Sequence, residues 1–336
     1  MPTTIRDVMK VLESVAPPVY QESYDNAGLI VGDPSAEVTG VVCSLDATEE
    51  VVAETAAKGC NLVVAHHPIV FKGLKRFNGS NYVERTVIRA IKEGVAIYAI
   101  HTNLDNVYHR GVNAKIAERL GLQNTSILAP KTVGHKLTLR VETAQAGALQ
   151  AKLEQAGVQR IHITGGTDRL RLEGYLPDAL IGATEALLRS DGINEYELVK
   201  VENADAAFGS GMVGELPEAM GEKDFMDHVI DRMNAPLIRH TALRKQPVKK
   251  VALCGGSGSF LLRKAIACGA DVFITGDFKY HEFFDAEGKI VIMDIGHFES
   301  EQFTIELLRD IIGENFSTFA LHLTGVITNP VNYYHK

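Results

Sequence analysis

The sequence predicts an α/β protein in which two related α/β halves form the core and a smaller α+β segment is inserted between them. Strands and helices alternate along the first third of the chain, which is typical of a parallel sheet covered by helices. The middle of the chain follows a β-α-β-β-α-β order instead. The last third repeats the first, because residues 248–277 share the strand–helix–strand plan and a glycine position of residues 38–67.

A chain of 336 residues is longer than a single hydrophobic core usually fills. We therefore divide it into three segments where the pattern changes. Residues 1–129 are predicted to be the first half of the core, residues 130–205 the inserted segment, and residues 206–336 the second half. Because the halves are similar, we expect them to pack against each other about a pseudo-twofold axis.

Apolar periodicity and helix-end residues place the elements of the first half. Residues 61–65 form an apolar run typical of a strand that is buried on both faces. Thr48 is suited to cap a helix, and Gly94 to end the next one. Residues 21–33 are predicted to be a loop. The predicted strands are 38–45, 61–65 and 95–100, and the predicted helices are 4–16, 48–58, 82–93 and 111–120.

The order of elements in the inserted segment is ferredoxin-like. Its predicted strands are 136–141, 159–164, 168–174 and 195–201, and its predicted helices are 145–156 and 180–189. A glycine-rich stretch, residues 208–214, is expected to lead the chain back to the core. A helix at 225–233, a strand at 289–295 and a helix at about 300–312 follow in the second half.

Composition narrows the class of protein. The net charge of −8 and the pI near 5.9 argue against a nucleic-acid partner, which would favour a basic face. The four cysteines form no C-x-x-C pair and are predicted to be buried free thiols in a reducing compartment. We find no signal-peptide pattern and no apolar run of the ~20 residues that span a membrane. The sequence therefore predicts a cytoplasmic protein that does not bind membranes.

Polar residues gather where the predicted strands end. His66 and His67 follow one apolar run, and a second run leads into His101 and Asp105. The strands of the second half end in Asp277 and in the stretch from Gly296 to Glu301. Ligands of open α/β sheets bind beyond the carboxyl ends of the strands. We therefore expect these residues to form one site.

The residue types at these strand ends suit divalent metal ions. If a helix has begun at His297, then His297 and Glu301 share one helix face, and an imidazole with a carboxylate is a good metal clamp. Neighbouring residues on a strand point to opposite sides, so His66 and His67 are expected to bind different ions. With Asp105 the set holds three imidazoles and two carboxylates. Two ions about 3.5–4 Å apart are the usual arrangement in two-metal hydrolytic sites.

Other interpretations stay open for single features. A His-His pair alone is more often a loop feature, and a His-x-x-x-Glu pair alone is more often on a surface; only their shared location favours a metal. His101 is expected to orient a metal ligand through a hydrogen bond. Asp277 is expected to contact substrate or to cap a helix. Glu299 or His101 is expected to serve as a base.

Two further stretches carry weaker signals. The glycine-rich stretch Cys254–Ser259 either cradles phosphate or makes a tight turn with close backbone approach. Lys72, Lys75 and Arg76 either attract an anionic substrate or form a solvated face. Residues 332–336 are expected to be a surface tail or an oligomer contact.

The spaced motifs of this chain resemble those of the NIF-three-like family (relatives of Ngg-one-interacting factor three). Bacterial members of that family are often named GTP cyclohydrolase I type 2 homologues. The resemblance covers both ends of the chain and departs at Tyr24, where many members carry tryptophan. The matching motifs are Tyr24–Leu29, Val64–Pro68, His101–Asp105, Ile274–Asp277 and Gly296–Glu301.

The resemblance implies a dinuclear metal site between the two halves. It implies two divalent cations per chain, with His67 and Asp105 on one, His66 and His297 on the other, and Glu301 as a bridge. Zinc, iron, manganese and nickel all suit such ligands. The resemblance further implies that residues 130–205 form a PII-like domain, and that the protein forms a toroidal hexamer, a trimer of dimers.

The leading functional hypothesis is a metal-dependent hydrolase of a nucleotide, GTP if the family name applies, with hydroxide attack on C8 of the purine. A hydrolase of phosphoesters, including phosphorylated small molecules, would use the same site equally well. The hypothesis from another class is a non-catalytic metal-binding or regulatory hub that uses the PII-like insert. The sequence identifies no residue as catalytic in its own right.

Overall fold

The computed structural model describes residues 2–166 and 168–334, and the chain divides into two compact units. The first unit combines Met1–Ala129 with Ala206–Lys336, and the second is Pro130–Asp205. Each unit has its own hydrophobic core. The predicted α/β class is confirmed, because strands and helices mix throughout and form two sheets.

The first sheet belongs to the first unit and has the strand order β1-β4-β3-β2-β13. Strands β2, β3, β4 and β13 are parallel, and β1 pairs antiparallel with β4 at one edge. Strand β13 comes from near the C-terminus, so the end of the chain completes a sheet that the beginning started. The strands are β1 (Gly28–Val31), β2 (Gly40–Asp46), β3 (Leu62–His67), β4 (Ala96–Ala99) and β13 (Ala320–Leu323).

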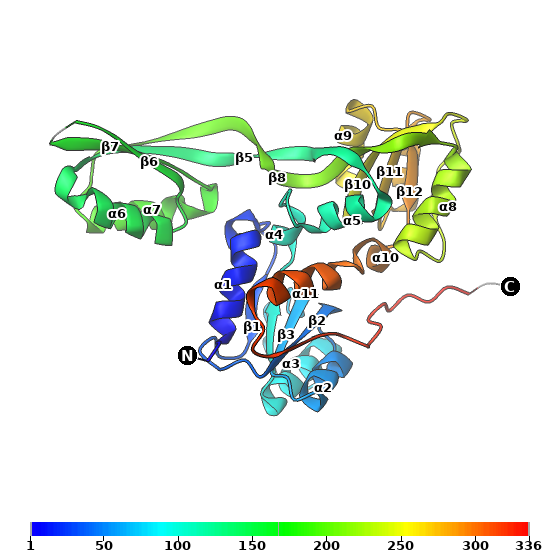
Figure 1. Cartoon of the computed structure of the whole chain (residues 1–336), viewed down its shortest axis with the longest axis horizontal. Coiled ribbons are helices and arrows are strands. Elements are labelled where there is room, and N and C mark those ends of the chain that lie inside the picture. The colour runs from blue at the N-terminus through cyan, green and yellow to red at the C-terminus, as the bar shows by residue number, and fades with distance from the viewer. Residues whose placement is uncertain (1, 167, 335–336) are drawn as a thin grey trace. The chain divides into compact units, whose positions relative to one another are not determined.

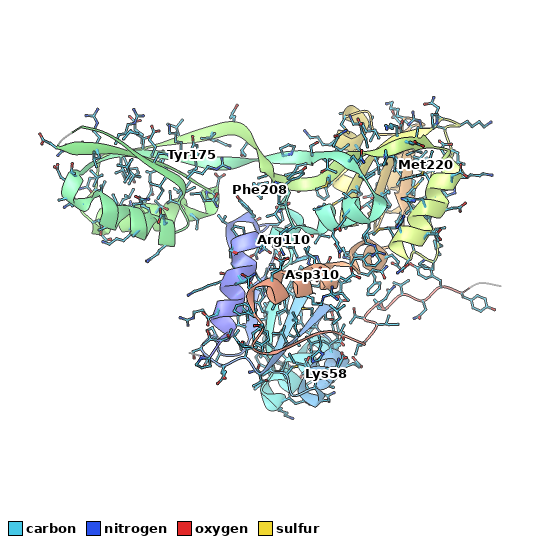
Figure 2. All side chains as sticks on the ribbon, in the orientation of Figure 1. Lys58, Arg110, Tyr175, Phe208, Met220 and Asp310 are labelled. Atoms are coloured by element: carbon cyan, nitrogen blue, oxygen red, sulfur yellow. The ribbon has the colours of Figure 1, made fainter. Side chains whose placement is uncertain are left out.

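Helices cover both faces of the first sheet. Helices α1 (Ile5–Val15) and α11 (Thr304–Asn315) pack on one face, and α2 (Glu49–Ala57) and α3 (Tyr82–Glu93) pack on the other. Figure 2 labels Lys58 at the end of α2 and Asp310 on α11, on these opposite faces. This cover explains why β2 and β3 are apolar without alternation.

The second sheet has the order β6-β7-β5-β8-β10-β11-β12-β9 and continues through β5 and β8 into the second unit. Strands β10, β11 and β12 are parallel and lie side by side (Figure 1). Strands β8 and β9 pair antiparallel at the two sides of this group. The strands of this part are β8 (Tyr196–Met220), β9 (Arg239–His240), β10 (Val248–Ser257), β11 (Val272–Gly276) and β12 (Val291–Asp294).

One apolar core lies between the two sheets of the first unit. It contains Val64 and Tyr98 from the first sheet and Leu253 and Met293 from the second. Helices α5 and α8 pack into this core, and α9 and η4 cover the other face of the second sheet. The helices and short helical turns are α4 (Thr102–Asp105), α5 (Val112–Leu120), α8 (Glu222–Met233), α9 (Leu262–Ala267), α10 (His297–Glu301), η1 (Pro18–Tyr20), η3 (Ser259–Leu261) and η4 (Tyr280–Ala286).

The second unit has the element order β-α-β-β-α-β that its sequence indicates. Strand β7 pairs antiparallel with both β5 and β6, and the helices pack around Leu137, Leu153 and Leu188. The elements are β5 (Gln123–Glu142), α6 (Thr143–Gln155), β6 (Gln159–Gly165), β7 (Arg169–Leu176), η2 (Asp178–Leu180), α7 (Ile181–Ser190) and the first part of β8. Within the described residues, no helix combines the length and apolar character needed to cross a membrane.

The structure corrects two sequence predictions of local structure, for residues 21–33 and for residues 300–312, and adds detail to a third. Residues 21–33 contain β1, a four-residue edge strand that depends on β4 for its only pairing. The glycine-rich stretch 208–214 lies inside β8, where a Cβ at Gly214 would come 2.9 Å from Thr125 Cγ2. The helix expected at about 300–312 is two helices, α10 and α11.

Candidate metal centre

The five predicted ligands lie together at the carboxyl ends of strands from both sheets. His66 and His67 are the last two residues of β3, and Asp105 ends α4, which follows β4. His297 and Glu301 begin and end α10, which follows β12. The expectation that the helix has begun at His297 is met, so His297 and Glu301 face the same side.

Glu301 lies at the middle of this cluster and is buried. Its Oε2 is 3.1 Å from His67 Nε2 and 3.2 Å from His297 Nε2. Its Oε1 lies 3.9 Å from His66 Nε2, which is in turn 3.5 Å from Asp105 Oδ1. Among the described residues, three groups of side chains could each hold a metal ion. Two of them share Glu301, namely His67, His297 and Glu301, and His66, Asp105 and Glu301; the third is His66, His67 and His101.

Two of these groups differ from the pairs that the resemblance implied. His66 lies with Asp105 and His67 lies with His297, whereas the resemblance placed His67 with Asp105 and His66 with His297. The reason lies in the position of β3 between β2 and β4. His66 Nδ1 donates to the carbonyl of Ile100 beyond β4, which turns its ring toward the α4 side, whereas His67 Nδ1 donates to Asp46 at the end of β2.

Every histidine of the two groups is oriented through its Nδ1 atom. His66 Nδ1 is 2.9 Å from the Ile100 oxygen, His67 Nδ1 is 2.8 Å from Asp46 Oδ1, and His297 Nδ1 is 2.7 Å from Asp277 Oδ2. Because these partners only accept, Nδ1 carries a proton in each ring, and Nε2 is the nitrogen that faces the cluster. This arrangement behind the ring is characteristic of metal-binding histidines.

Two carboxylates orient ligand histidines, and only one of them, Asp277, was singled out from the sequence. Asp277 was expected to contact substrate or cap a helix; in the structure it lines the cavity and accepts a hydrogen bond from His297. Asp46 was missed, although it ends the apolar strand β2 in the same way that His66 and His67 end β3. Applying the strand-end rule to β2 would have found it.

The group around His66 contains two buried polar atoms without a hydrogen-bond partner among the described residues. These atoms are His66 Nε2 and Asp105 Oδ1. A buried polar group left unpaired costs about 1–3 kcal/mol. Burial lowers the pKa of His66 to about 4, so its imidazole is neutral. A neutral imidazole and a carboxylate that point at each other are a donor set that fits a divalent cation.

In the group around His67 and His297, protonated imidazoles form hydrogen bonds with the Glu301 carboxylate. Burial lowers the pKa of His67, but hydrogen bonds with Asp46 and Glu301 outweigh it and raise the pKa to about 9. Burial is likewise outweighed at His297 by Asp277 and Glu301, which raise its pKa to about 11. The pKa of Glu301 is held well below its usual value: burial opposes this, and the hydrogen bonds with the histidines prevail. A metal ion would replace these protons.

Asp105 has the opposite shift. Burial and the nearby Glu301 carboxylate raise its pKa well above the ordinary value for aspartate. A buried carboxylate and a partly buried one this close repel each other when both are ionised, and a cation between them removes that repulsion. The repulsion between these carboxylates, like the unpaired atoms of His66 and Asp105, fits a divalent cation at this position.

His101 faces the cluster from the side of β4. Its ring lies edge-on to those of His66 and His67, with centroids 5.2 and 5.3 Å away. Its Nδ1 donates to Asp25 Oδ1 over 2.8 Å, and Asp25 also accepts from the Thr102 backbone. These contacts outweigh the burial of Asp25 and lower its pKa to about 2. Asp25 lies in the motif Tyr24–Leu29, but its role depends on contacts with His101 and Thr102, which are far away in the sequence.

The glycine-rich stretch Cys254–Ser259 forms a wall of the cluster. Strand β10 runs through Ser257, and Gly256 has a left-handed φ of 61°. A Cβ on Gly256 would come within 2.5 Å of Glu301 Oε1 and 3.2 Å of His297 Cε1. Of the two interpretations, close backbone approach is the one that the geometry supports.

The cluster opens into a cavity of about 1480 Å³ within the first unit. Tyr24, Phe71 and Phe260 are exposed and line this cavity. Lys72 and Arg239 also line it, whereas Lys75 and Arg76 do not belong to its wall. Glu299 is buried beside it and accepts hydrogen bonds from Asn329 and Tyr333 of the C-terminal segment.

The Duf34/NIF3 (NGG1p interacting factor 3) family model matches residues 3–330, and the chain belongs to this family. The resemblance inferred from the motifs is confirmed. The chain is similar to a "GTP cyclohydrolase 1 type 2 homolog" of Staphylococcus epidermidis, with 28% identity over 98% of this chain and 99% of that protein.

Two solved structures share the fold over nearly the whole length. The crystal structure of Staphylococcus aureus protein SA1388 has a TM-score of 0.79 at 28% identity and covers 99% of both chains. A Bacillus cereus protein related to NIF3 has a TM-score of 0.76 at 28% identity and covers 99% of this chain and all of its own.

Proposed function

We propose that this chain holds two divalent metal ions and acts as a metal-dependent hydrolase. The observation that carries the proposal is the position of Glu301, which presents one carboxylate oxygen to each of two ligand groups. His67 Nε2, His297 Nε2 and Oε2 would hold one ion. His66 Nε2, Asp105 Oδ1 and Oε1 would hold the other. Paired divalent ions supply Lewis acidity and lower the pKa of water, which is the chemistry of two-metal hydrolases.

The residues around the ligands have separate tasks in this proposal. Asp46 and Asp277 keep the Nε2 atoms of His67 and His297 directed at the centre. The Nδ1–H group of His101 donates a hydrogen bond to Asp25. We propose that Nε2 of His101 accepts a proton from a reactant in the cavity.

We propose a nucleotide as the substrate, with GTP as the first candidate. The relatives carry the name "GTP cyclohydrolase 1 type 2 homolog", and hydroxide attack at C8 of guanine would be the corresponding reaction. Exposed Tyr24 and Phe260 offer faces for a base, and Lys72 and Arg239 offer charge for phosphates. The second candidate reaction is the hydrolysis of a phosphoester bond, either in a nucleotide or in a phosphorylated small molecule. It would use the same residues.

A non-catalytic hub is the candidate from another class. The second unit has its own core, and the residues that line the cavity all come from the first unit. An independent unit of this kind suits the binding of a partner or a small ligand. For either candidate we also propose that residues 130–205 form a PII-like domain, that the chain assembles into a hexameric ring and that the protein is cytoplasmic.

We also propose that the core consists of two related halves, residues 1–129 and 206–336. In support, β2, β3 and β4 are parallel in that order, with antiparallel β1 beside β4. The strands β10, β11 and β12 repeat this arrangement, with antiparallel β9 beside β12. The metal ligands break the symmetry, because β3 ends in two histidines and its counterpart β11 ends in Gly276.

The proposal is tested by assaying metal-loaded and metal-stripped protein against nucleotides and phosphoesters. We expect turnover that depends on metal and that is lost in His67→Ala and Glu301→Ala. His281→Ala removes an exposed histidine outside the cavity and should keep full activity. Turnover that survives metal removal would contradict the hydrolase, and absence of turnover with intact metal binding would favour the hub.

A further inference from the structure

The C-terminal strap, residues 324–334, runs from the first sheet to the metal centre. Strand β13 pairs in parallel with β2, and Thr324 N donates to the Cys43 carbonyl just after β13 ends. The strap therefore leaves the sheet next to the end of β2, the strand that carries Asp46. From there it passes beside α10 (Figure 1, red).

A continuous series of close polar contacts leads from the strap to the carboxylate shared by the two ligand groups. Thr328 Oγ1 donates to Asp46 Oδ2 over 2.6 Å. Asp46 Oδ1 accepts from His67 Nδ1 over 2.8 Å, and His67 Nε2 lies 3.1 Å from Glu301 Oε2. Each oxygen of Asp46 thus has its own partner, one in the strap and one in the centre.

This division of partners has a conformational consequence. The terminal torsion of an aspartate side chain has a broad energy minimum, so a single hydrogen bond does not fix the plane of the carboxylate. The second bond, from Thr328, fixes that plane. A fixed Asp46 holds the ring of His67 in one orientation, and the supporting residues behind metal ligands act in this way.

The strap also reaches the helix that carries the other ligands of the same group. Asn329 Nδ2 and the Tyr333 hydroxyl donate to Glu299 Oε1 over 3.0 and 3.2 Å. Glu299 lies on α10 between His297 and Glu301. The two attachments of the strap therefore lie on the side of His67 and His297, and the His66 group is oriented by Ile100 instead.

We infer that Thr328 is a positioning residue that sets the affinity of the His67–His297–Glu301 group for its metal ion. The inference rests on the metal centre proposed above and adds to it a selective role for the C-terminal strap. The His66–Asp105–Glu301 group should be nearly independent of Thr328.

The test is Co²⁺ titration of the full chain, followed by calorimetry and by the visible absorption of bound cobalt. Thr328→Val removes the hydroxyl and keeps the shape, and we expect one of the two Co²⁺ ions to bind about 10-fold or more weakly, with an altered spectrum. The step that weakens should be the one lost in His67→Ala. Thr328→Ser restores the hydroxyl and should restore both steps.

The strap provides a matched control in Thr324. Its hydroxyl also donates to a carboxylate, that of Glu54, but outside the cavity wall. Thr324→Val should keep both Co²⁺ affinities. Thr328→Ala, which is smaller than threonine and cannot overpack the site, repeats the test if the valine variant folds poorly.

Two results would overturn the inference. Wild-type affinities for both ions in Thr328→Val and Thr328→Ala would show that the hydroxyl does not position His67. An equal loss in Thr324→Val or Thr328→Ser would show that the strap acts only by general packing. A wild-type chain that binds no Co²⁺ is a different result, because it would contradict the metal centre itself.

Discussion

Asp277 holds His297 through a hydrogen bond of 2.7 Å while its own backbone is left-handed, with a φ of 59°. Aspartate and asparagine tolerate this region better than other side chains. Strained backbone is often retained where the surrounding structure uses it. Here the left-handed turn follows β11 directly and brings the carboxylate behind the imidazole of a proposed metal ligand.

Substitution of Asp277 should separate charge from backbone conformation. Asp277→Asn keeps the left-handed tolerance and an acceptor oxygen but loses the charge, so we expect metal affinity to fall about 10-fold with little change in stability. Asp277→Ala should lose more affinity and also about 1 kcal/mol of stability, because alanine tolerates the conformation poorly. Metal titration and thermal unfolding measure the two effects, and equal behaviour of the two variants would contradict this reasoning.

Metal affinity should rise with pH. In the metal-free protein His67, with a pKa of about 9, and His297, with a pKa of about 11, carry protons at pH 7. An ion that binds their Nε2 atoms must displace those protons, so lower pH disfavours binding. Titrations between pH 6 and pH 9 should show affinity that increases throughout, with proton release that varies with the ionisation enthalpy of the buffer. Affinity that is independent of pH would contradict the assignment of these ligands.

The same two pKa values predict the stability of the metal-free protein. A histidine whose pKa is raised on folding stabilises the folded state fully below its unfolded pKa of about 6.5. This contribution is lost as the pH rises through the folded values of about 9 and about 11. Metal-free protein should therefore lose stability between pH 7 and pH 11, and His67→Ala should lose less of it over that range.

Gly256 should tolerate no side chain. A Cβ at this position would meet Glu301 Oε1 at 2.5 Å, and its φ of 61° disfavours other residues. We expect Gly256→Ala to lower stability by about 1–3 kcal/mol and to weaken metal binding, because Glu301 must move. Gly182→Ala is the control: it lies within helix α7 with open space around it, and it should be neutral or stabilising by about 0.5–1 kcal/mol.

The sequence predicted the site better than it predicted the edges of the sheets. The rule that polar residues after buried strands share one edge brought together His66, His67 and Asp105 and the first turn of α10. Strands β1, β9 and β13 have 4, 2 and 4 residues and were missed. Segments this short have no periodicity of their own, and their distant pairing partners determine them.

The pairing of the ligands needed information that a single sequence does not contain. That His66 and His67 point to opposite sides follows from strand geometry, but which side faces Asp105 depends on the order of β2, β3 and β4 in the sheet. The contacts of Asp25 and Thr328 likewise join residues far apart in the chain. No local pattern marks such residues as part of a site.

Glu301→Gln tests whether one residue serves both ion sites. The amide keeps the size of the side chain but offers a single, uncharged oxygen, so we expect both binding steps to weaken. His66→Ala and His67→Ala should each weaken mainly one step. Calorimetric titration with Zn²⁺ or Co²⁺ distinguishes these patterns, and a Glu301→Gln variant that loses only one step would contradict the sharing.

The most direct measurement is anomalous diffraction from crystals grown with Zn²⁺. We expect two zinc peaks per chain, about 3.5–4 Å apart, as in other two-metal sites. One peak should lie against His66, Asp105 and Glu301, and the other against His67, His297 and Glu301. A single peak, or a peak bound by His67 together with Asp105, would contradict the account.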